Sequence, residues 1–163
     1  MRKSETPDQA WPKIKHFCSY RERCHYEVRE KLFGMMLGKK DVDTIVARLI
    51  EDGYLNEERF AIQFAGGHFR QKKWGKVKIV YELRQKRISE NIIKKALKEL
   101  QGEDYAGILE KLALAKWKSL KAEQYLNRQA KTIAYLARKG YEMPMITEVI
   151  KKIRSDPARQ NNR

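Results

Sequence analysis

The chain has 163 residues, of which 36 are Lys or Arg and 21 are Asp or Glu, so its formal net charge is +15. That charge favours a polyanion or an acidic protein surface as partner, although it excludes no fold class. A hydrophobic content of 42% suffices for a buried core, and the absence of any run of 18 apolar residues excludes a membrane-spanning helix. The first residues carry charge without the apolar stretch of a secretory signal, so we expect a cytoplasmic protein with no membrane partner.

Apolar residues recur at the helical period along almost the whole chain, and no proline lies between Lys13 and Met143. Glycines interrupt the pattern where helices are expected to end. Four residues are expected to cap helix N-termini, namely Thr6, Asp41, Asn56 and Ser89. These signals predict helices over residues 7–20, 25–37, 41–52, 56–73, 76–87, 89–100, 103–120, 122–139 and 143–154.

The nine predicted helices fall into three groups of three. The end of the second group matches the end of the third at an offset of 53, as in Leu83 with Leu136 and Lys86 with Lys139. The first group matches the second more loosely, at an offset of 47, which pairs Met36 with Leu83. A compact helical bundle is the alternative to stacked repeats. We expect an all-α, elongated array of three tandem three-helix repeats, at 7–53, 54–101 and 102–155, and a frayed tail at 156–163.

Few residues point to catalysis or metal binding. Cys18 and Cys24 are too few for a disulfide framework. His16 and His25 lie near them, but His16 and Cys18 are two residues apart on a predicted helix and therefore point about 200° apart. Cys18 is better interpreted as a core residue beneath Ile14. Because no P-loop, nucleophile elbow or H-E-x-x-H motif is present, we expect no enzyme, no metal and no cofactor. A hydrolase without a recognisable site is the alternative.

Positive charge concentrates in one segment of the second repeat. Residues 70–87 contain eight Lys or Arg and a single acid, Glu82. Such bases can neutralise phosphates, and Trp74 or Phe69 can stack on a nucleobase. The alternative is that the charges are solvated helix ends and that Trp74 fills a joint between two helices. The candidate binding residues are Arg70, Lys72, Lys73, Trp74, Lys76, Lys78, Arg84, Lys86 and Arg87.

The predicted helix over 76–87 separates apolar from basic residues. Val77, Val80 and Leu83 recur every three residues and form its expected core stripe. Arg84 and Arg87 share a face at i, i+3, opposite much of that stripe. One helix can therefore contribute both to a core and to a basic surface.

Three blocks of sequence carry a family resemblance. The stretch SYRERCHYEVREKL contains Arg21, Glu27 and Lys31, the stretch GYLNEERFA begins at Gly53, and the stretch GKVKIVYELRQKRI begins at Gly75. In combination these blocks resemble the RecX family of bacterial recombination regulators, and the match covers about residues 10–100. The chain departs from the family pattern where Cys24 replaces a Ser, Val28 a Leu, Trp74 a Lys and Arg87 a Gly.

The resemblance implies three three-helix repeats and a regulator without catalytic activity. It implies the RecA recombinase filament as partner, in whose helical groove the family binds, bridging protomers and limiting strand exchange and ATP hydrolysis. It also implies binding to single- and double-stranded DNA and a role in recombination, repair and the SOS response. We expect a monomer. The charge of the candidate residues does not distinguish RecA acids from DNA phosphates, and the alternative is a free-standing nucleic-acid-binding protein without a RecA role.

Overall fold

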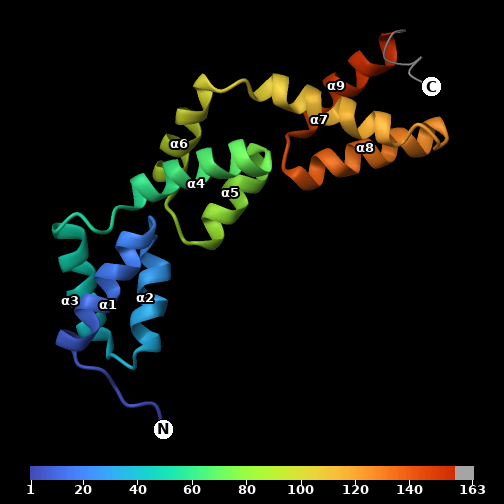
Figure 1. Cartoon of the computed structure of the whole chain (residues 1–163). Coiled ribbons are helices and arrows are strands. Elements are labelled where there is room, and N and C mark those ends of the chain that lie inside the picture. The colour runs from blue at the N-terminus through green and yellow to red at the C-terminus, as the bar shows by residue number, and fades with distance from the viewer. Residues whose placement is uncertain (157–163) are drawn as a thin grey trace. The chain divides into compact units, whose positions relative to one another are not determined.

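The computed structural model describes residues 1–156, and all regular structure in that part of the chain is helical (Figure 1). The expected all-α class is confirmed. The expected frayed tail at 156–163 lies, apart from Asp156, outside the described residues. Within the described part, nine α-helices and one 3-10 turn follow one another: α1 (Pro7–Tyr20), α2 (His25–Gly34), α3 (Lys39–Glu51), α4 (Glu57–Lys72), α5 (Lys76–Gln85), α6 (Glu90–Glu99), η1 (Leu100–Gly102), α7 (Tyr105–Ser119), α8 (Tyr125–Lys139) and α9 (Met143–Ser155).

Three of the four expected N-caps are confirmed. The Thr6 side chain accepts a first-turn amide and completes a capping box, and Asn56 and Ser89 each accept the backbone N–H three residues further on. The fourth expectation, Asp41, is wrong, because α3 begins directly after Gly38. Asp41 lies in the first turn, where its negative charge still favours the helix dipole.

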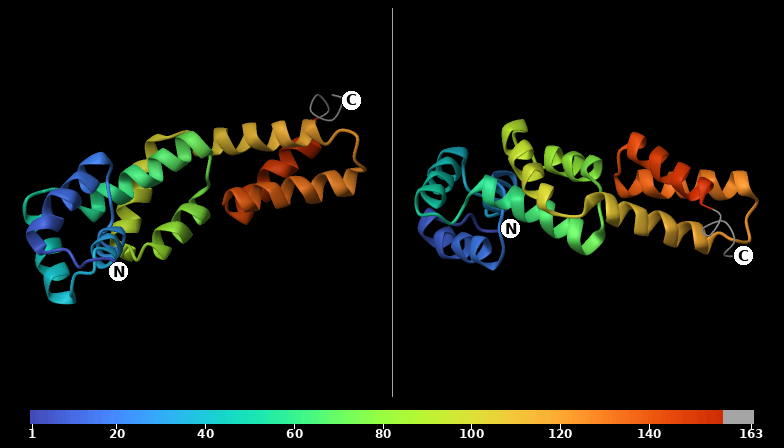
Figure 2. Two further views of the ribbon diagram at one scale, coloured as in Figure 1. Left: turned by 60° about the horizontal axis from the view of Figure 1, so that its bottom comes forward. Right: turned by 90° about the horizontal axis from the view of Figure 1, so that it is seen from above.

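The chain forms two compact units. Unit 1 comprises Met1–Phe64 and Leu83–Ala96, and unit 2 comprises Ala65–Glu82 and the chain from Leu97 onward. Helices α1, α2 and α3 pack against one another in unit 1, and α7, α8 and α9 do so in unit 2 (Figure 2). The division passes through α4, α5 and α6, so residues of the second helix group contribute to both units.

Burial confirms most of the expected apolar faces and corrects two details. Cys18 is buried with Ile14 in the core of unit 1, as expected. Val77, expected in the core stripe of α5, is 53% exposed, and Ile79 is the buried residue in its place. The stripe of α5 therefore follows Ile79 and Leu83 at a spacing of four, the closer approximation to one helical turn. Phe69, considered for base stacking, is only 2% exposed.

A left-handed residue follows the second helix of each group. These residues are Met36 (φ 64°), Arg87 (φ 59°) and Gly140 (φ 97°). The step from Arg87 to Gly140 confirms the offset of 53. The offset of 47 for the first group is wrong, because the step from Met36 to Arg87 is 51 and α2 recurs as α5 at the same interval. A slip of four residues is about one helical turn and leaves the apolar face unchanged, so hydrophobic periodicity did not reveal it.

The two cysteines are buried free thiols. Burial raises the pKa of Cys18 and of Cys24 to about 11. Within residues 1–156, no group of three or more His, Cys, Asp or Glu side chains is placed to hold a metal ion. In the same part of the chain, none of the helices is both long enough and apolar enough to cross a bilayer.

Candidate functional site

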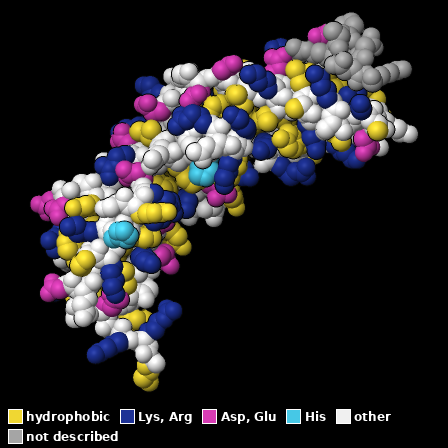
Figure 3. Space-filling view, in the orientation of Figure 1, with side chains coloured by type: hydrophobic (Ala, Val, Ile, Leu, Met, Phe, Trp, Pro, Cys, Tyr) yellow, Lys and Arg dark blue, Asp and Glu magenta, His cyan; other side chains and the backbone are white. Residues whose placement is uncertain are grey.

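Charge by itself does not mark a site on this protein. On the face seen in Figure 3, Lys and Arg side chains are scattered, with acidic side chains among them. The useful distinction is between cations that have a carboxylate partner and cations that have none. The nine candidate residues differ in this respect, and they also belong to different units: Arg84, Lys86 and Arg87 to unit 1, and the other six to unit 2.

The end of α4 sets the position of the tryptophan. Lys73 adopts a left-handed conformation with φ 58°, which ends the helix. The amides of Lys73 and Trp74 then donate to the carbonyls of Phe69 and His68. This turn places the Trp74 ring on the imidazole of His68, with 4.4 Å between the ring centroids. The half-buried ring therefore packs against α4, as a joint-filling aromatic would.

Two lysines flank the Trp74 ring. The Nζ atoms of Lys72 and Lys78 lie 5.3 Å and 4.5 Å from its centroid, within the range of cation–π attraction. Phe69, by contrast, is stacked on Tyr105 with 5.7 Å between the ring centroids. Because Phe69 is buried, a nucleobase cannot stack on it. Of the two aromatic candidates, only Trp74 lies beside cationic side chains at the surface.

The start of α5 is fixed by close backbone packing within unit 2. The amides of Gly75 and Val77 donate to the carbonyls of Lys139 and Gly140, at 2.8 Å and 2.9 Å. A Cβ on Gly75 would stand 2.3 Å from the carbonyl carbon of Gly140, so only glycine fits there. The first amides of α5 thus have protein acceptors, and an anion would have to be held by side chains.

Tyr105 also fixes the start of α5. The Tyr105 hydroxyl accepts the amide of Lys76 at 2.9 Å and donates to Glu142 at 2.8 Å. Burial raises the pKa of Tyr105, with the hydrogen bond to Glu142 acting in the same direction. The Nζ of Lys76 lies 4.6 Å above the ring. The backbone of Lys76 is therefore held firmly, while its ammonium group stays on the surface of this joint.

Lys139 is not among the nine candidate residues, but it lies beside the end of α4. The Lys139 ammonium donates to the carbonyl of Lys72 at 3.0 Å, and the Tyr141 hydroxyl donates to the carbonyl of Lys73 at 2.9 Å. These bonds bring the end of α8 beside the end of α4. The sequence signal for Lys139 was its position as the repeat counterpart of Lys86.

Five lysines that lie together at the ends of α4 and α8 and the start of α5 have no carboxylate within ion-pair distance among the described residues. We call them the lysine cluster: Lys72, Lys73, Lys76, Lys78 and Lys139. Arg70 lies in the same unit but pairs with Glu103 at 2.9 Å. A set of cations without counter-charges is the arrangement that attracts an external anion.

Two of the three candidates of unit 1 have a carboxylate partner, and the third, Arg87, has an aromatic one. Arg84 donates two hydrogen bonds to Glu90, and these bonds raise the pKa of Arg84 and lower that of Glu90. The Arg87 guanidinium lies 4.7 Å above the ring of Tyr26. Lys86 pairs with Glu27 at 3.2 Å. The structure thus gives Arg84 and Lys86 local stabilising contacts.

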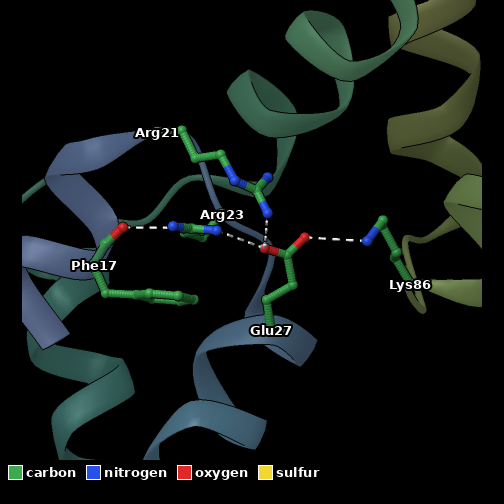
Figure 4. Close-up of polar contacts among 5 residues, drawn as sticks. All are labelled: Phe17, Arg21, Arg23, Glu27 and Lys86. Atoms are coloured by element: carbon green, nitrogen blue, oxygen red, sulfur yellow. Dashed lines mark hydrogen bonds and ion pairs between the residues drawn. The ribbon is translucent and has the colours of Figure 1, made fainter. Parts of the chain in front are cut away.

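Glu27 is the centre of a partly buried ionic network (Figure 4). Its side chain is 13% exposed and has three cations around it, Arg21 at 3.3 Å, Arg23 at 3.6 Å and Lys86 at 3.2 Å. Arg23 also donates its Nε–H to the carbonyl of Phe17 at 3.0 Å and stacks on that ring. Burial lowers the pKa of Arg23, and Glu27 opposes that effect. The network ties α2 to the residues that follow α5 within unit 1.

Known proteins resemble this chain over most of its length. Models of the RecX second and third three-helix domains match residues 56–97 and 103–150. The "Regulatory protein RecX" of Chlorobium phaeobacteroides (strain BS1) is 32% identical over 133 residues, which are 82% of this chain and 85% of that protein. The chain belongs to the RecX family. The "Regulatory protein RecX" of Chlorobium limicola is 27% identical over 135 residues, which are 83% of this chain and 83% of that protein.

The RecX fold is likewise shown by a solved structure. The crystal structure of RecX from Lactobacillus salivarius superposes with a TM-score of 0.79 at 22% identity, covering 90% of this chain and 95% of that one. Within the RecX pattern, Glu27 is the carboxylate of the ionic network, and Gly75 is the glycine that contacts Gly140. Arg87 occupies a left-handed position where the RecX pattern has Gly, so this chain carries a strained residue there.

Proposed function

We propose that this chain regulates the RecA recombinase filament, binding in the filament groove and limiting strand exchange and ATP hydrolysis, with accompanying DNA binding. Membership of the RecX family is the observation that carries the proposal, since its relatives bear the name of regulatory proteins. The chemistry of the lysine cluster also supports the proposal. Its five ammonium groups lack counter-ions in the described residues and can meet acidic side chains or phosphates.

The internal contacts of Arg84 and Lys86 favour contact residues in unit 2. Arg84 is engaged with Glu90 and Lys86 with Glu27, so each would have to give up an internal partner to bind an external one. The lysines around Trp74 have no such competition. Trp74 positions two of these lysines and offers an apolar surface beside them.

The test uses RecA filaments assembled on single-stranded DNA before the protein is added. We expect inhibition of DNA-dependent ATP hydrolysis at amounts well below one chain per RecA protomer. The inhibition should persist when a large excess of competitor duplex is present, because the chain acts on the filament. Inhibition that appears only near saturation of the DNA and disappears with competitor would support a free-standing DNA-binding protein instead.

A charge-reversal variant locates the contact. Replacing Lys72, Lys73 and Lys76 by Glu should abolish most of the inhibition while helical content is unchanged. The matched control replaces three exposed lysines of unit 2 outside the cluster, Lys98, Lys111 and Lys118, by Glu, with the same change in net charge. Equal losses in both variants would mean that net charge, and not the cluster, determines the effect.

A further inference from the structure

A second basic feature lies in the third helix group, away from the nine candidate residues and from Lys139. A cavity of about 980 Å³ is lined by the ends of α7 and α9 and the start of α8. Its wall includes two carboxylates, Glu123 and Glu148, and two aromatic rings, Trp117 and Tyr125. It also includes five cationic side chains, which belong to Lys121, Arg128, Lys151, Lys152 and Arg154.

The two carboxylates of the wall already have cationic partners. Glu123 pairs with Lys131, which lies outside the wall, at 2.5 Å. Glu148 pairs with Lys151 at 3.8 Å, on an exposed helix surface. Cations therefore outnumber carboxylates in the wall by five to two, and one of the two carboxylates is neutralised from outside the wall. The cavity favours an anionic ligand.

Arg128 strengthens this conclusion. Its Nε–H donates to the carbonyl of Trp117 at 2.8 Å, and its guanidinium lies 4.2 Å above the indole ring. Burial lowers the pKa of Arg128. Arg23 of unit 1 makes the same two contacts with Phe17 but has Glu27 as counter-ion.

Arg128 has no carboxylate partner among the described residues. A partly desolvated guanidinium is costly without a counter-charge. The four N–H donors other than Nε–H suit a phosphate, which guanidinium groups bind in a bidentate manner. The comparison with Arg23 indicates that a ligand anion takes the role that Glu27 has in unit 1.

An aromatic ring at the cavity indicates which class of anionic ligand binds there. Tyr125 is 44% exposed and is anchored edge-on against Trp117, with 5.8 Å between centroids. An exposed ring beside phosphate-binding cations is the arrangement by which proteins hold single-stranded nucleic acid, with a base stacked on the ring. In a duplex the bases are stacked on each other and are not available to such a ring.

We propose that this cavity binds single-stranded nucleic acid, with a phosphate at Arg128 and the neighbouring lysines and a base on Tyr125. The assignment rests on the DNA-binding part of the proposed function and is independent of RecA. It places nucleic-acid binding on α7–α9, whereas the lysine cluster lies at the ends of α4 and α8 and the start of α5. The two surfaces can therefore be separated by mutation.

The first experiment measures binding of the full chain to a fluorescent oligothymidylate by anisotropy, without RecA, over a range of salt concentrations. Replacing Lys121, Lys151 and Lys152 by Gln should weaken binding by about tenfold or more and reduce the slope of log affinity against log salt by about 2, or 0.7 for each lost phosphate contact. The control replaces Lys98, Lys111 and Lys118 by Gln and should change the slope by less than half as much. Equal effects of both variants would overturn the assignment.

The second experiment tests the aromatic contact. Tyr125→Ala should weaken binding to the single strand by about tenfold and leave binding to duplex unchanged, because stacking on an unpaired base is lost. Tyr125→Phe keeps the ring and should bind as the parent does. Cross-linking to an iodouracil-substituted oligonucleotide should label the peptide that contains Tyr125. A cross-link confined to the peptide around Trp74, or an equal loss for duplex and single strand, would overturn the assignment.

The third measurement separates this inference from the proposed function. The variant with Lys121, Lys151 and Lys152 replaced is added to preformed RecA filaments, and ATP hydrolysis is followed. Lost inhibition with unchanged oligothymidylate binding would show that the cavity meets an acidic protein segment, which overturns the nucleic-acid assignment and leaves RecA regulation standing. Lost oligothymidylate binding with retained inhibition supports the assignment.

Discussion

Gly75 and Gly140 contact each other through their backbones, at the start of α5 and the end of α8. A Cβ on Gly75 would lie 2.3 Å from the carbonyl carbon and oxygen of Gly140, and the neighbouring amides and carbonyls of these segments are hydrogen-bonded. This contact holds Lys139 beside Lys72 and so completes the lysine cluster.

Gly75→Ala should therefore destabilise the protein by about 3 kcal/mol, because the added methyl group forces two backbones apart. Urea denaturation followed by circular dichroism measures the change. Gly67→Ala is the matched control, since Gly67 lies inside α4 and a methyl group added there would have no atom within 4 Å. The control should be neutral or stabilising by up to about 1 kcal/mol, as Ala favours helix over Gly. A harmless Gly75→Ala would contradict the close contact.

Arg87→Gly should stabilise the protein by about 1 kcal/mol relative to Arg87→Ala. Both variants remove the contact with Tyr26, but only glycine adopts φ 59° without a steric penalty. Differential scanning calorimetry of the two variants measures the difference. Equal stability of both would mean that residue 87 is not held in the left-handed conformation.

Glu27→Gln should cost about 3 kcal/mol of unfolding free energy, because three cations, one of them buried, lose their shared carboxylate. Glu58→Gln is the control within the same unit. Its partner Lys95 lies 3.2 Å away, but both side chains are largely exposed, so the loss should stay within about 0.5 kcal/mol. Chemical denaturation of both variants checks the prediction, and equal losses would refute a central role for Glu27.

The thiols predict an alkaline loss of stability. The pKa values of Cys18 and Cys24 are raised in the folded state from 9.0 to about 11, so the folded chain holds these protons more tightly than the unfolded chain. Their contribution is complete below pH 9 and is lost as the pH rises from about 9 to 11. At pH 10 the ionisation of each thiol should lower the free energy of unfolding by about 1 kcal/mol.

Unfolding free energies between pH 8 and pH 10 measure this slope. A variant with both cysteines replaced by Ala should be less stable at pH 8, since both sites are buried, but should show a flatter pH dependence. An unchanged slope in that variant would assign the alkaline loss to other groups.

Much of this architecture follows from local sequence. Local spacing and chemistry, over residues a few positions apart, determine the cap at Thr6 and the contact of Cys18 with Ile14 in one core. The same holds for the nine helical ranges within residues 1–156. The offset of 53 between the second and third helix groups was also readable from sequence. The offset of the first group was not, because a shift of one turn preserves a helical pattern.

The candidate site depended on tertiary structure. Sequence placed Lys86 and Lys76 in one basic segment, but folding gives Lys86 a carboxylate 59 positions away and leaves Lys76 without one among the described residues. Likewise, only folding brings the Lys139 ammonium group to the carbonyl of Lys72, which lies 67 positions away in the sequence. Ion pairing acts through space over a few ångströms, so which cations remain available to a partner is decided only when distant segments pack together.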